Sequence, residues 1–475
     1  MKNLKKTLAL VAALALSATA LYGCGDKTES SSKAPATTTT AADDSKDETT
    51  AADDSKESSA ADVAEDTGDQ LTILCWNTDD SQPMVDLFCQ ETGTDASKIN
   101  IKSFGVQGGQ AAEQYTAYLS DASNDADIMF LEADWALQFI NDDEQTVPLS
   151  DIGLSEGDFK DLYPYVLEIG KSTTTGDLKG VSWQSAAGGY CYREDLAEKY
   201  LSVKSPEEMQ AKVADWDKFK ATAKELSDAT SGKTALSATL GGVWQVYSGS
   251  RDTAWVKDDT LVVDDYCKNY AEFAKELWTN GYVTQVAQWA DEWKPLGQTD
   301  DVMGFFVSTW GFGDTILTAA AGGEGGATYG KWKCVVGPEE FYWGGTWLAP
   351  TKRCDNPNLA AKFIKFFTTD ADTAEKYALS KGEYMSNQKV MEKIISDKSY
   401  KGAGVLGGQN QFEVLNEVAQ GIDMTGKITP YDARIKTEFS NAVQDYAKGD
   451  YATVDDALEA FKDAVASKIT DITVE

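Results

Sequence analysis

The pattern of apolar and polar residues becomes regular at residue 71. Leu71, Ile73 and Cys75 take every second position of "LTILC", which predicts a short buried strand. Two further strands are predicted at residues 100–104 and within residues 126–135, and residues 84–93 and 111–123 between them have helical spacing. Strand, helix, strand, helix, strand is the order of a parallel α/β sheet, in which ligands bind beyond the carboxyl ends of the strands.

The rest of the chain continues as an α/β protein. A strand, a glycine pair, a second strand and a helix are predicted in that order over residues 178–200, and residues 301–316 form a strand that ends at the glycine-flanked Trp310. An amphipathic helix is predicted over residues 212–230, a second helix begins near residue 266 and is stopped by Asn280-Gly281, and a third is predicted over residues 356–370, followed by a mostly helical last hundred residues. Because one core seldom grows beyond roughly 250–300 residues, the 475 residues predict two domains.

Charge and composition exclude several classes of function. Acidic residues outnumber basic ones 77 to 43, and the net charge of −34 disfavours nucleic acid as a partner. The chain has no histidine, which excludes serine–histidine and cysteine–histidine catalysis and histidine-ligated zinc. We expect neither a metal nor a cofactor, while carboxylate-pair and lysine chemistry stay open.

Residues 1–23 have the form of an export signal. Three lysines, at positions 2, 5 and 6, precede an apolar run that ends at Leu21 and is too short for a typical membrane span. The run leads into "LYGC", which resembles the lipobox of bacterial lipoproteins and implies lipid attachment at Cys24. Tyr22 is bulkier than the lipobox usually shows, and an ordinary cleavage site beside a chance cysteine is the alternative.

Residues 24–70 form a polar spacer in this interpretation. From residue 25 onward the segment holds thirteen acidic residues and four lysines, and it repeats ten residues as "TTAADDSKDE" (39–48) and "TTAADDSKES" (49–58). Since so little of it can be buried, we predict a disordered, self-repelling tether that holds the folded part away from a surface.

Six cysteines follow the spacer, and none forms a CxxC motif. They are Cys75, Cys89, Cys191, Cys267, Cys334 and Cys354. Most lie in apolar strand or helix contexts, where a free thiol packs as a small hydrophobic group. We therefore expect free thiols, with one unassigned bridge as the alternative.

Six segments in register resemble a known family. They are "ADIMFLEADWALQF", "GVSWQSAAGGYCYREDL", "GFFVSTWGFGDTI", "WKCVVGPEEFYWGGTWLAP", "NPNLAAKFIKFFTT" and "KGEYMSNQKV". Their order is similar to that of bacterial extracellular solute-binding proteins, in the carbohydrate-binding branch (family 1) that contains the maltose-binding and multiple-sugar-binding proteins of ABC importers. The resemblance covers nearly all of residues 71–475.

The resemblance implies a type II periplasmic-binding-protein fold, in which two α/β lobes close on a sugar like a hinge. One lobe would comprise residues 71–184 and 341–384, and the other residues 185–340 and 385–475, with crossings near Trp183, Tyr342 and Met385. It also implies an extracellular protein, anchored by its lipid to the outer face of the cytoplasmic membrane. Its partners would be a carbohydrate and the permease subunits of the importer, and we expect a monomer.

Flat apolar rings and planar polar side chains suit a sugar, because rings cover its C–H faces and polar groups take its hydroxyls. The segment "FYWGGTWLAP" offers two tryptophans beside glycines, which allow close backbone approach. The predicted ligand-binding residues are Trp76, Asp79, Asp134, Trp183, Gln184, Trp244, Trp310, Trp343, Trp347 and Tyr384. The alternative for several of these aromatic residues, including Trp244 and Trp347, is packing in the core. The number of aromatic residues favours an oligosaccharide over a monosaccharide.

Three other functions compete with sugar capture. A surface glycosidase would also use aromatic residues and a pair of carboxylates, spaced roughly 5–9.5 Å apart. A binding protein for another small solute is the second alternative, and a purely adhesive surface protein is the third. The leader, the predicted crossings and the order of the segments favour a binding protein that is not an enzyme.

Overall fold

The computed structural model describes residues 63–79 and 81–475, which belong to one compact unit. The predicted leader, Cys24 and the ten-residue repeats lie outside the described residues. Residues 64–68 run beside residues 355–358: the Thr67 amide donates to the Asp355 carbonyl at 2.8 Å, and the Asn358 amide donates to the Asp66 carboxylate at 2.8 Å.

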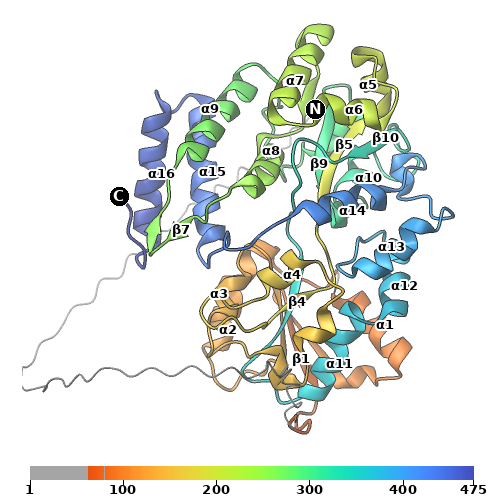
Figure 1. Cartoon of the computed structure of the whole chain (residues 1–475), viewed down its shortest axis with the longest axis vertical. Coiled ribbons are helices and arrows are strands. Elements are labelled where there is room, and N and C mark those ends of the chain that lie inside the picture. Colours follow the sequence, from red (N-terminus) through yellow and green to blue (C-terminus); the bar gives the residue numbers. More distant parts are fainter. Residues whose placement is uncertain (1–62, 80) are drawn as a thin grey trace, which may run out of the picture. The chain divides into compact units, whose positions relative to one another are not determined.

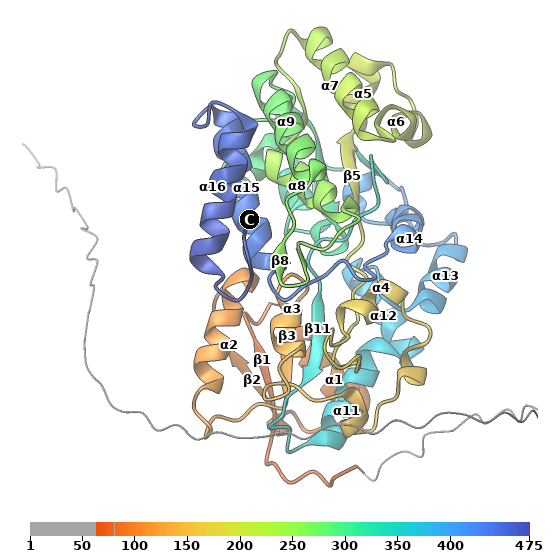
Figure 2. The same ribbon diagram turned by 60° about the vertical axis from the view of Figure 1, so that its left-hand side comes forward.

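The first lobe is built on a five-stranded sheet with the order β2-β1-β3-β11-β4. As predicted, three of its strands are parallel: β1 (Leu71–Cys75), β2 (Ile99–Ser103) and β3 (Ile128–Glu132). Strand β11 (Thr346–Pro350) enters antiparallel between β3 and β4 (Val181–Ser182). Figure 2 shows β1, β2, β3 and β11 side by side, so a segment more than 200 residues further along the chain completes this sheet.

Helices flank the first sheet and close its core (Figure 1). Phe88, on α1, contacts Phe363 and Phe366, on α11, with ring centroids 5.1 and 5.3 Å apart. The helices of this part are α1 (Ser81–Thr92), α2 (Ala111–Leu119), α3 (Ala136–Ile140), α4 (Pro164–Ile169), α11 (Pro357–Thr368), α12 (Ala371–Lys381) and α13 (Gln388–Ser396).

The second lobe is built on a four-stranded sheet with the order β10-β5-β9-β6. Strand β5 (Gly188–Arg193) pairs antiparallel with β10 (Trp332–Val335) and β9 (Val302–Ser308), and β6 (Ala235–Ser237) is parallel to β9. A two-stranded hairpin, β7 (Val256–Lys257) and β8 (Thr260–Leu261), lies apart from this sheet. The helices of the second lobe are α5 (Glu194–Leu201), α6 (Pro206–Val213), α7 (Trp216–Thr230), α8 (Leu240–Tyr247), α9 (Asp265–Thr279), α10 (Leu317–Ala320), α14 (Gln411–Gly421), α15 (Asp432–Lys448) and α16 (Val454–Lys468).

One predicted helix is in fact two. The sequence predicts a single helix over residues 212–230, but α6 ends at Val213 and α7 begins at Trp216. The Asp215 side chain accepts a hydrogen bond from the Lys218 amide at 2.7 Å, so Asp215 is the N-cap of a new helix. The apolar spacing continues across the break, which hides the break from a periodicity argument.

Three segments connect the two sheets. One joins β4 to β5, a second joins β10 to β11, and a third leads from α12 toward α14. They run alongside one another, because Gln184 forms an isolated bridge with Met385 and Ala187 forms one with Tyr342. The Ser386 amide also donates to the Trp183 carbonyl at 2.8 Å.

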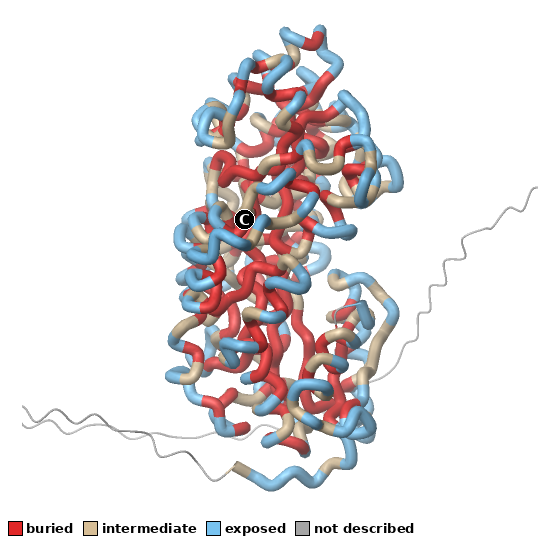
Figure 3. Tube along the Cα trace, turned by 90° about the vertical axis from the view of Figure 1, so that its right-hand side faces the viewer, coloured by how far each residue is buried: buried red, intermediate tan, exposed pale blue. Residues whose placement is uncertain are grey.

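The core runs through both lobes, and Figure 3 shows buried segments mainly along the middle of the trace and exposed segments at its outside. As predicted, the six described cysteines are free thiols. Within the described residues, no helix combines the length and the apolar character needed to cross a bilayer.

Candidate functional site

Two glycines lie where the second connecting segment enters β11. Gly344 and Gly345 have φ values of +67° and +100°, a region that side-chain-bearing residues rarely adopt. A Cβ atom on Gly344 would lie 3.4 Å from Trp310 Nε1 and 3.5 Å from Glu132 Oε1. The bare backbone of Gly344 therefore brings a tryptophan of the second lobe close to a carboxylate of the first.

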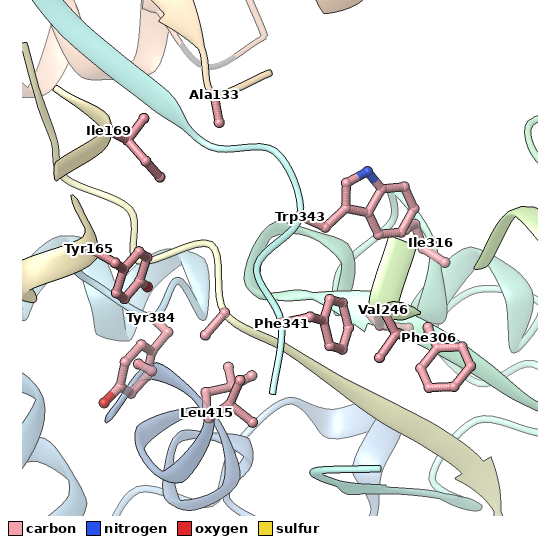
Figure 4. Close-up of a cluster of buried hydrophobic side chains, with 14 of the residues drawn as sticks. Ala133, Tyr165, Ile169, Val246, Phe306, Ile316, Phe341, Trp343, Tyr384 and Leu415 are labelled. Atoms are coloured by element: carbon pink, nitrogen blue, oxygen red, sulfur yellow. The ribbon is translucent and has the colours of Figure 1, made fainter. Parts of the chain in front are cut away.

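Trp310 and Trp343 beside this backbone belong to a group of four tryptophans in ring contact, which we call the indole cluster: Trp289, Trp293, Trp310 and Trp343. The rings of Trp310 and Trp343 are 4.9 Å apart, and Trp310 Nε1 donates to the Trp343 carbonyl at 2.8 Å. Figure 4 shows Trp343 on the connecting segment, with Phe341 two positions before it.

Trp289 is the solvent-exposed member of the indole cluster. Its ring stacks on that of Trp310 at a centroid distance of 6.2 Å and an interplanar angle of 15°, yet 54% of the residue is exposed. Its φ of +70° is unfavourable for a residue with a side chain, by about 1–2 kcal/mol. The Trp289 ring also contacts the rings of Trp293 and Trp343, at centroid distances of 4.8 and 5.8 Å, and these contacts help to hold the conformation of Trp289. An exposed indole on a packed indole base is a flat apolar surface available to a ligand.

The first lobe contributes a second aromatic wall at the carboxyl ends of β1 and β3. The ring of Trp76 lies 6.4 Å from that of Trp135, and Trp135 Nε1 donates to the Gly108 carbonyl at 3.1 Å. A Cβ atom on Gly108 would lie 3.8 Å from both the Trp76 ring and Glu132 Cγ. Glu132 is thus positioned between this wall and Gly344.

Glu132 is held in an environment that disfavours its charge. Burial, with a further contribution from the Asp134 carboxylate, raises the pKa of Glu132 well above its usual value. The Asp134 amide, which donates to Glu132 Oε2 at 3.2 Å, acts in the opposite direction. A half-buried carboxyl group of this kind both accepts and, when protonated, donates hydrogen bonds.

An ion pair joins the two lobes beside Glu132. Asp134, just after β3, accepts a hydrogen bond from Lys436 Nζ, on α15, at 3.0 Å. Burial alone would lower the pKa of Lys436, but Asp134, Tyr342 and Asp432 outweigh it and raise that pKa. Burial raises the pKa of Asp432 to about 6, although Lys436 opposes the shift. Polar side chains of both lobes therefore meet at one place.

Most of the sequence matches a known family. The model of the bacterial extracellular solute-binding proteins matches residues 83–402, which is more than half of the chain. The chain belongs to this family. No curated protein sequence matches it.

Several solved structures of other solute-binding proteins have the same fold as this one. A crystal structure described as an extracellular solute-binding protein of family 1 has a TM-score of 0.71 and 17% identity, and covers 85% of this chain and 99% of its own. The ABC transporter associated binding protein from B. animalis subsp. lactis, in complex with beta-1,6-galactobiose, has a TM-score of 0.66 and 16% identity, over 86% and 100% of the two chains. The galacto-N-biose-/lacto-N-biose I-binding protein of Bifidobacterium longum, with lacto-N-biose, has a TM-score of 0.64 and 16% identity, over the same shares.

The structure brings four of the predicted site residues to the region of the indole cluster and Glu132. Trp310 and Trp343 belong to the indole cluster, while Trp76 and Asp134 lie at the end of the first sheet. Asp79 is exposed in the loop after β1, and its amide donates to Asn77 Oδ1 at 3.0 Å.

The other predicted residues lie in packed layers in this structure. Trp183 is 1% exposed and packs against Phe130, and Trp347 is fully buried with Nε1 donating to the Val166 carbonyl at 2.8 Å. Trp244 packs against Tyr270 and Phe439. Trp183, Trp244 and Trp347 therefore lie outside the indole cluster, because an indole fills a core as readily as it covers a ligand.

Gln184 and Tyr384 have structural partners on the connecting segments. The Gln184 amide group accepts from the Thr346 amide at 3.0 Å and donates to Glu383 Oε2 at 3.3 Å. The Tyr384 hydroxyl is 2.7 Å from that of Tyr163. These bonds tie the connecting segments together, and they leave neither side chain directed at the indole cluster.

Three residues of the site were not predicted from the sequence. Glu132 lies two positions before Asp134 and so points to the same side of an extended chain, a signal that was available. Trp289 lies in an irregular segment without periodicity, and Lys436 lies on an amphipathic helix like many other surface lysines. For these two, no local pattern distinguishes a site residue.

Proposed function

We propose that this solute-binding protein captures a neutral oligosaccharide between its lobes and delivers it to the permease of an ABC importer. The observation that carries the proposal is the position of Gly344, with an indole on one side and the Glu132 carboxyl group on the other. Rings suit the C–H faces of a sugar and carboxyl groups suit its hydroxyls. Two structures with this fold are complexes with beta-1,6-galactobiose and with lacto-N-biose, which supports a carbohydrate ligand.

The proposal includes closure of the lobes as the capture step. Three connecting segments form the hinge, and the two glycines give the second of them torsional freedom. Ligand contacts with both walls favour the closed arrangement, because the ligand then binds that arrangement better than the open one. The permease would recognise the closed form, and the protein would act as a binder rather than as a hydrolase.

The proposal places the protein at the cell surface. The leader of residues 1–23 would be removed and Cys24 lipidated, so that the part of the predicted spacer before residue 64 tethers a monomeric binding unit to the outer face of the cytoplasmic membrane. Radiolabelled palmitate incorporation in the native host tests this part, and it should disappear in Cys24→Ala.

Tryptophan fluorescence tests the capture of a sugar. Purified protein is titrated with β-1,6-galactobiose, lacto-N-biose and maltose, and a saturable change is expected with at least one of them. Trp310→Ala should weaken that binding tenfold or more, whereas Trp216→Phe, which alters an indole on α7 outside the cluster, should leave the dissociation constant unchanged. Unchanged affinity in Trp310→Ala would remove the indole cluster from the site.

Glu132→Gln tests the polar half of the site. Replacing the carboxyl group that bonds a sugar hydroxyl should weaken binding by up to about tenfold, in line with a hydrogen bond of about 0.5–1.5 kcal/mol. Glu113→Gln, on the exposed face of α2, is the matched control. Sustained release of reducing ends from the bound sugar would show that the protein is a hydrolase and would overturn the proposal.

A further inference from the structure

A cavity of about 210 Å³ lies within the second lobe, and Trp244 is the one predicted site residue in its lining. Its walls come from α8, α9, α15 and residues 285–288, and we call it the amide pocket because of four glutamines in its lining. The residues that matter here are Trp244, Gln245, Trp278, Gln285, Gln288 and Gln444. A cavity of about 150 Å³ is enough for a benzene ring, so this one has room for a six-membered ring with substituents.

Most of the amides in the pocket have no partner. Within the described part of the chain, the side chains of Gln245, Gln285 and Gln288 make no hydrogen bond, and Gln288 Nε2 is inaccessible to solvent. Of these three side chains, only Gln288 has a buried amide nitrogen without a partner, and a ligand hydroxyl would supply the missing acceptor. Gln444 donates to Ser440 Oγ at 3.1 Å and keeps its acceptor oxygen.

The lining chemistry favours a neutral, hydroxyl-bearing ring. Each amide offers donors and an acceptor, which match hydroxyl groups that also do both. Among the described residues no carboxylate lines the pocket, and the one cation in its lining, Lys448, has its Nζ 3.6 Å from the carboxylate of Asp445. Trp244 and Trp278 supply flat apolar surface in the same space.

The amide pocket and the indole cluster share one short segment. Gln288 lines the pocket, and the next residue, Trp289, stacks in the cluster. Gly241, in the first turn of α8, leaves room for Gln288, because a Cβ atom there would collide with Gln288 Oε1. The left-handed φ of Trp289 fixes the backbone at the junction of the two places.

We propose that the amide pocket is a binding subsite for one further neutral pyranose ring. The inference rests on the proposed function in one respect, namely that the ring belongs to the oligosaccharide whose other rings contact the indole cluster. The pocket would then give the protein a preference for longer chains, because each added ring in a formed subsite brings contacts that a disaccharide cannot make.

Fluorine NMR of protein labelled with 5-fluorotryptophan tests the pocket directly. Methyl β-D-galactopyranoside and methyl α-D-glucopyranoside serve as single-ring probes, and Trp278→Phe assigns the reporter resonance. A saturable shift of the Trp278 signal is expected in the wild type and in Trp310→Ala, with loss of the shift in Gln245→Leu/Gln288→Leu. If neither probe shifts the Trp278 signal, or if the shift persists in the double variant, the proposal that the amide pocket binds a pyranose ring is wrong.

Chain-length preference tests the link to the main site. Whichever series binds, galactobiose with galactotriose or maltose with maltotriose, the wild type should bind the trisaccharide at least fivefold more tightly. In Gln245→Leu/Gln288→Leu that gain should vanish while the disaccharide affinity stays within twofold, and Gln114→Leu, on the exposed face of α2, should behave as the wild type. If the double variant loses affinity equally for the disaccharide and the trisaccharide, the proposal of a separate subsite is wrong. If no oligosaccharide binds but the single-ring probes still shift the Trp278 signal, only the proposed function of the indole cluster is wrong.

Discussion

The Asp134 carboxylate and the Lys436 ammonium group form a 3.0 Å ion pair between residues 302 positions apart in the chain. Asp134 follows a strand of the first lobe, and Lys436 lies on a helix of the second. The side chain of Lys436 is 19% exposed and that of Asp134 is 37% exposed, so water screens the pair only in part. The pair therefore links the lobes in the described arrangement.

We predict a measurable coupling energy for this pair. A double-mutant cycle with Asp134→Asn and Lys436→Met, followed by urea unfolding, should give about 1–2 kcal/mol. The exposed pair Lys224–Asp228 on α7 is the control and should give only about 0.3–0.5 kcal/mol. Equal coupling energies for the two pairs would mean that Asp134 and Lys436 contribute no more than a surface contact.

Gly345 should be far less tolerant of a side chain than other left-handed glycines. In Gly345→Ala the new Cβ atom would lie 2.9 Å from Ala186 Cβ and 3.1 Å from the Trp347 ring, in addition to the strained φ. We expect a loss of about 2–4 kcal/mol in the free energy of unfolding.

Gly93→Ala isolates the cost of the backbone conformation. Gly93 has a φ of +68°, and nothing lies within 4 Å of its Cβ position. This variant should lose about 1 kcal/mol. If chemical denaturation shows the same loss of unfolding free energy in Gly345→Ala and Gly93→Ala, the close approach of Ala186 and Trp347 to Gly345 adds nothing to the cost of a side chain there.

Asp127 should make the stability depend on pH. It is buried before β3, where it accepts hydrogen bonds from the amides of Thr72 at 2.7 Å and Asn356 at 3.0 Å. Burial raises its pKa to about 6, with smaller contributions from Asp125 and Asp355, although the amide donors oppose the shift. The folded state thus binds a proton more tightly than the unfolded state does, so this contribution to stability falls as the pH rises through about 4–6.

The comparison that tests this uses Asp127→Asn. Between pH 4.5 and 7.5 the wild type should lose about 2 kcal/mol of unfolding free energy relative to the variant, by linkage. Asp463→Asn, at an exposed position of α16, should keep the wild-type pH dependence. A pH profile of Asp127→Asn parallel to that of the wild type would contradict the raised pKa.

The strand register selects one pair of cysteines for oxidation. Cys191 and Cys334 are directly opposite each other on the antiparallel strands β5 and β10. The amide of Cys334 donates to the Gln409 side chain at 2.7 Å, and its carbonyl accepts from the same side chain at 2.7 Å. Both peptide groups therefore face away from β5, which makes this a non-hydrogen-bonded pair with Cα atoms about 4.5 Å apart, within the range of a disulfide.

We predict that refolding in a glutathione disulfide buffer forms the Cys191–Cys334 bridge, with a gain of up to about 3–5 kcal/mol in unfolding free energy for so long a loop. Peptide mapping by mass spectrometry should find the bridge in the wild type and in Cys267→Ala, but not in Cys191→Ser. A different pairing, or six free thiols after refolding, would refute this prediction.

Much of the fold follows from local pattern. The strands β1, β2 and β3 and the helices between them were predicted within a few residues, because a buried strand or an amphipathic helix repeats its apolar positions at a period that the backbone imposes. The break between α6 and α7 was missed because an N-cap aspartate interrupts a helix without interrupting that period.

The sequence by itself determined the α/β class, the need for two lobes, the exclusion of histidine chemistry and the presence of flat rings beside a glycine pair. Only the tertiary structure decided where the rings lie: Trp289 and Trp310 keep exposed surface beside the largely buried Trp343, Trp183 and Trp347 are packed inside, and Trp244 lines the amide pocket. The physical reason is that a buried indole and a ligand-facing indole look alike in a local pattern, since the same apolar surface serves both purposes. Their difference arises from segments far apart in the chain, such as the partners of Asp134 and Gly344, which only folding brings together.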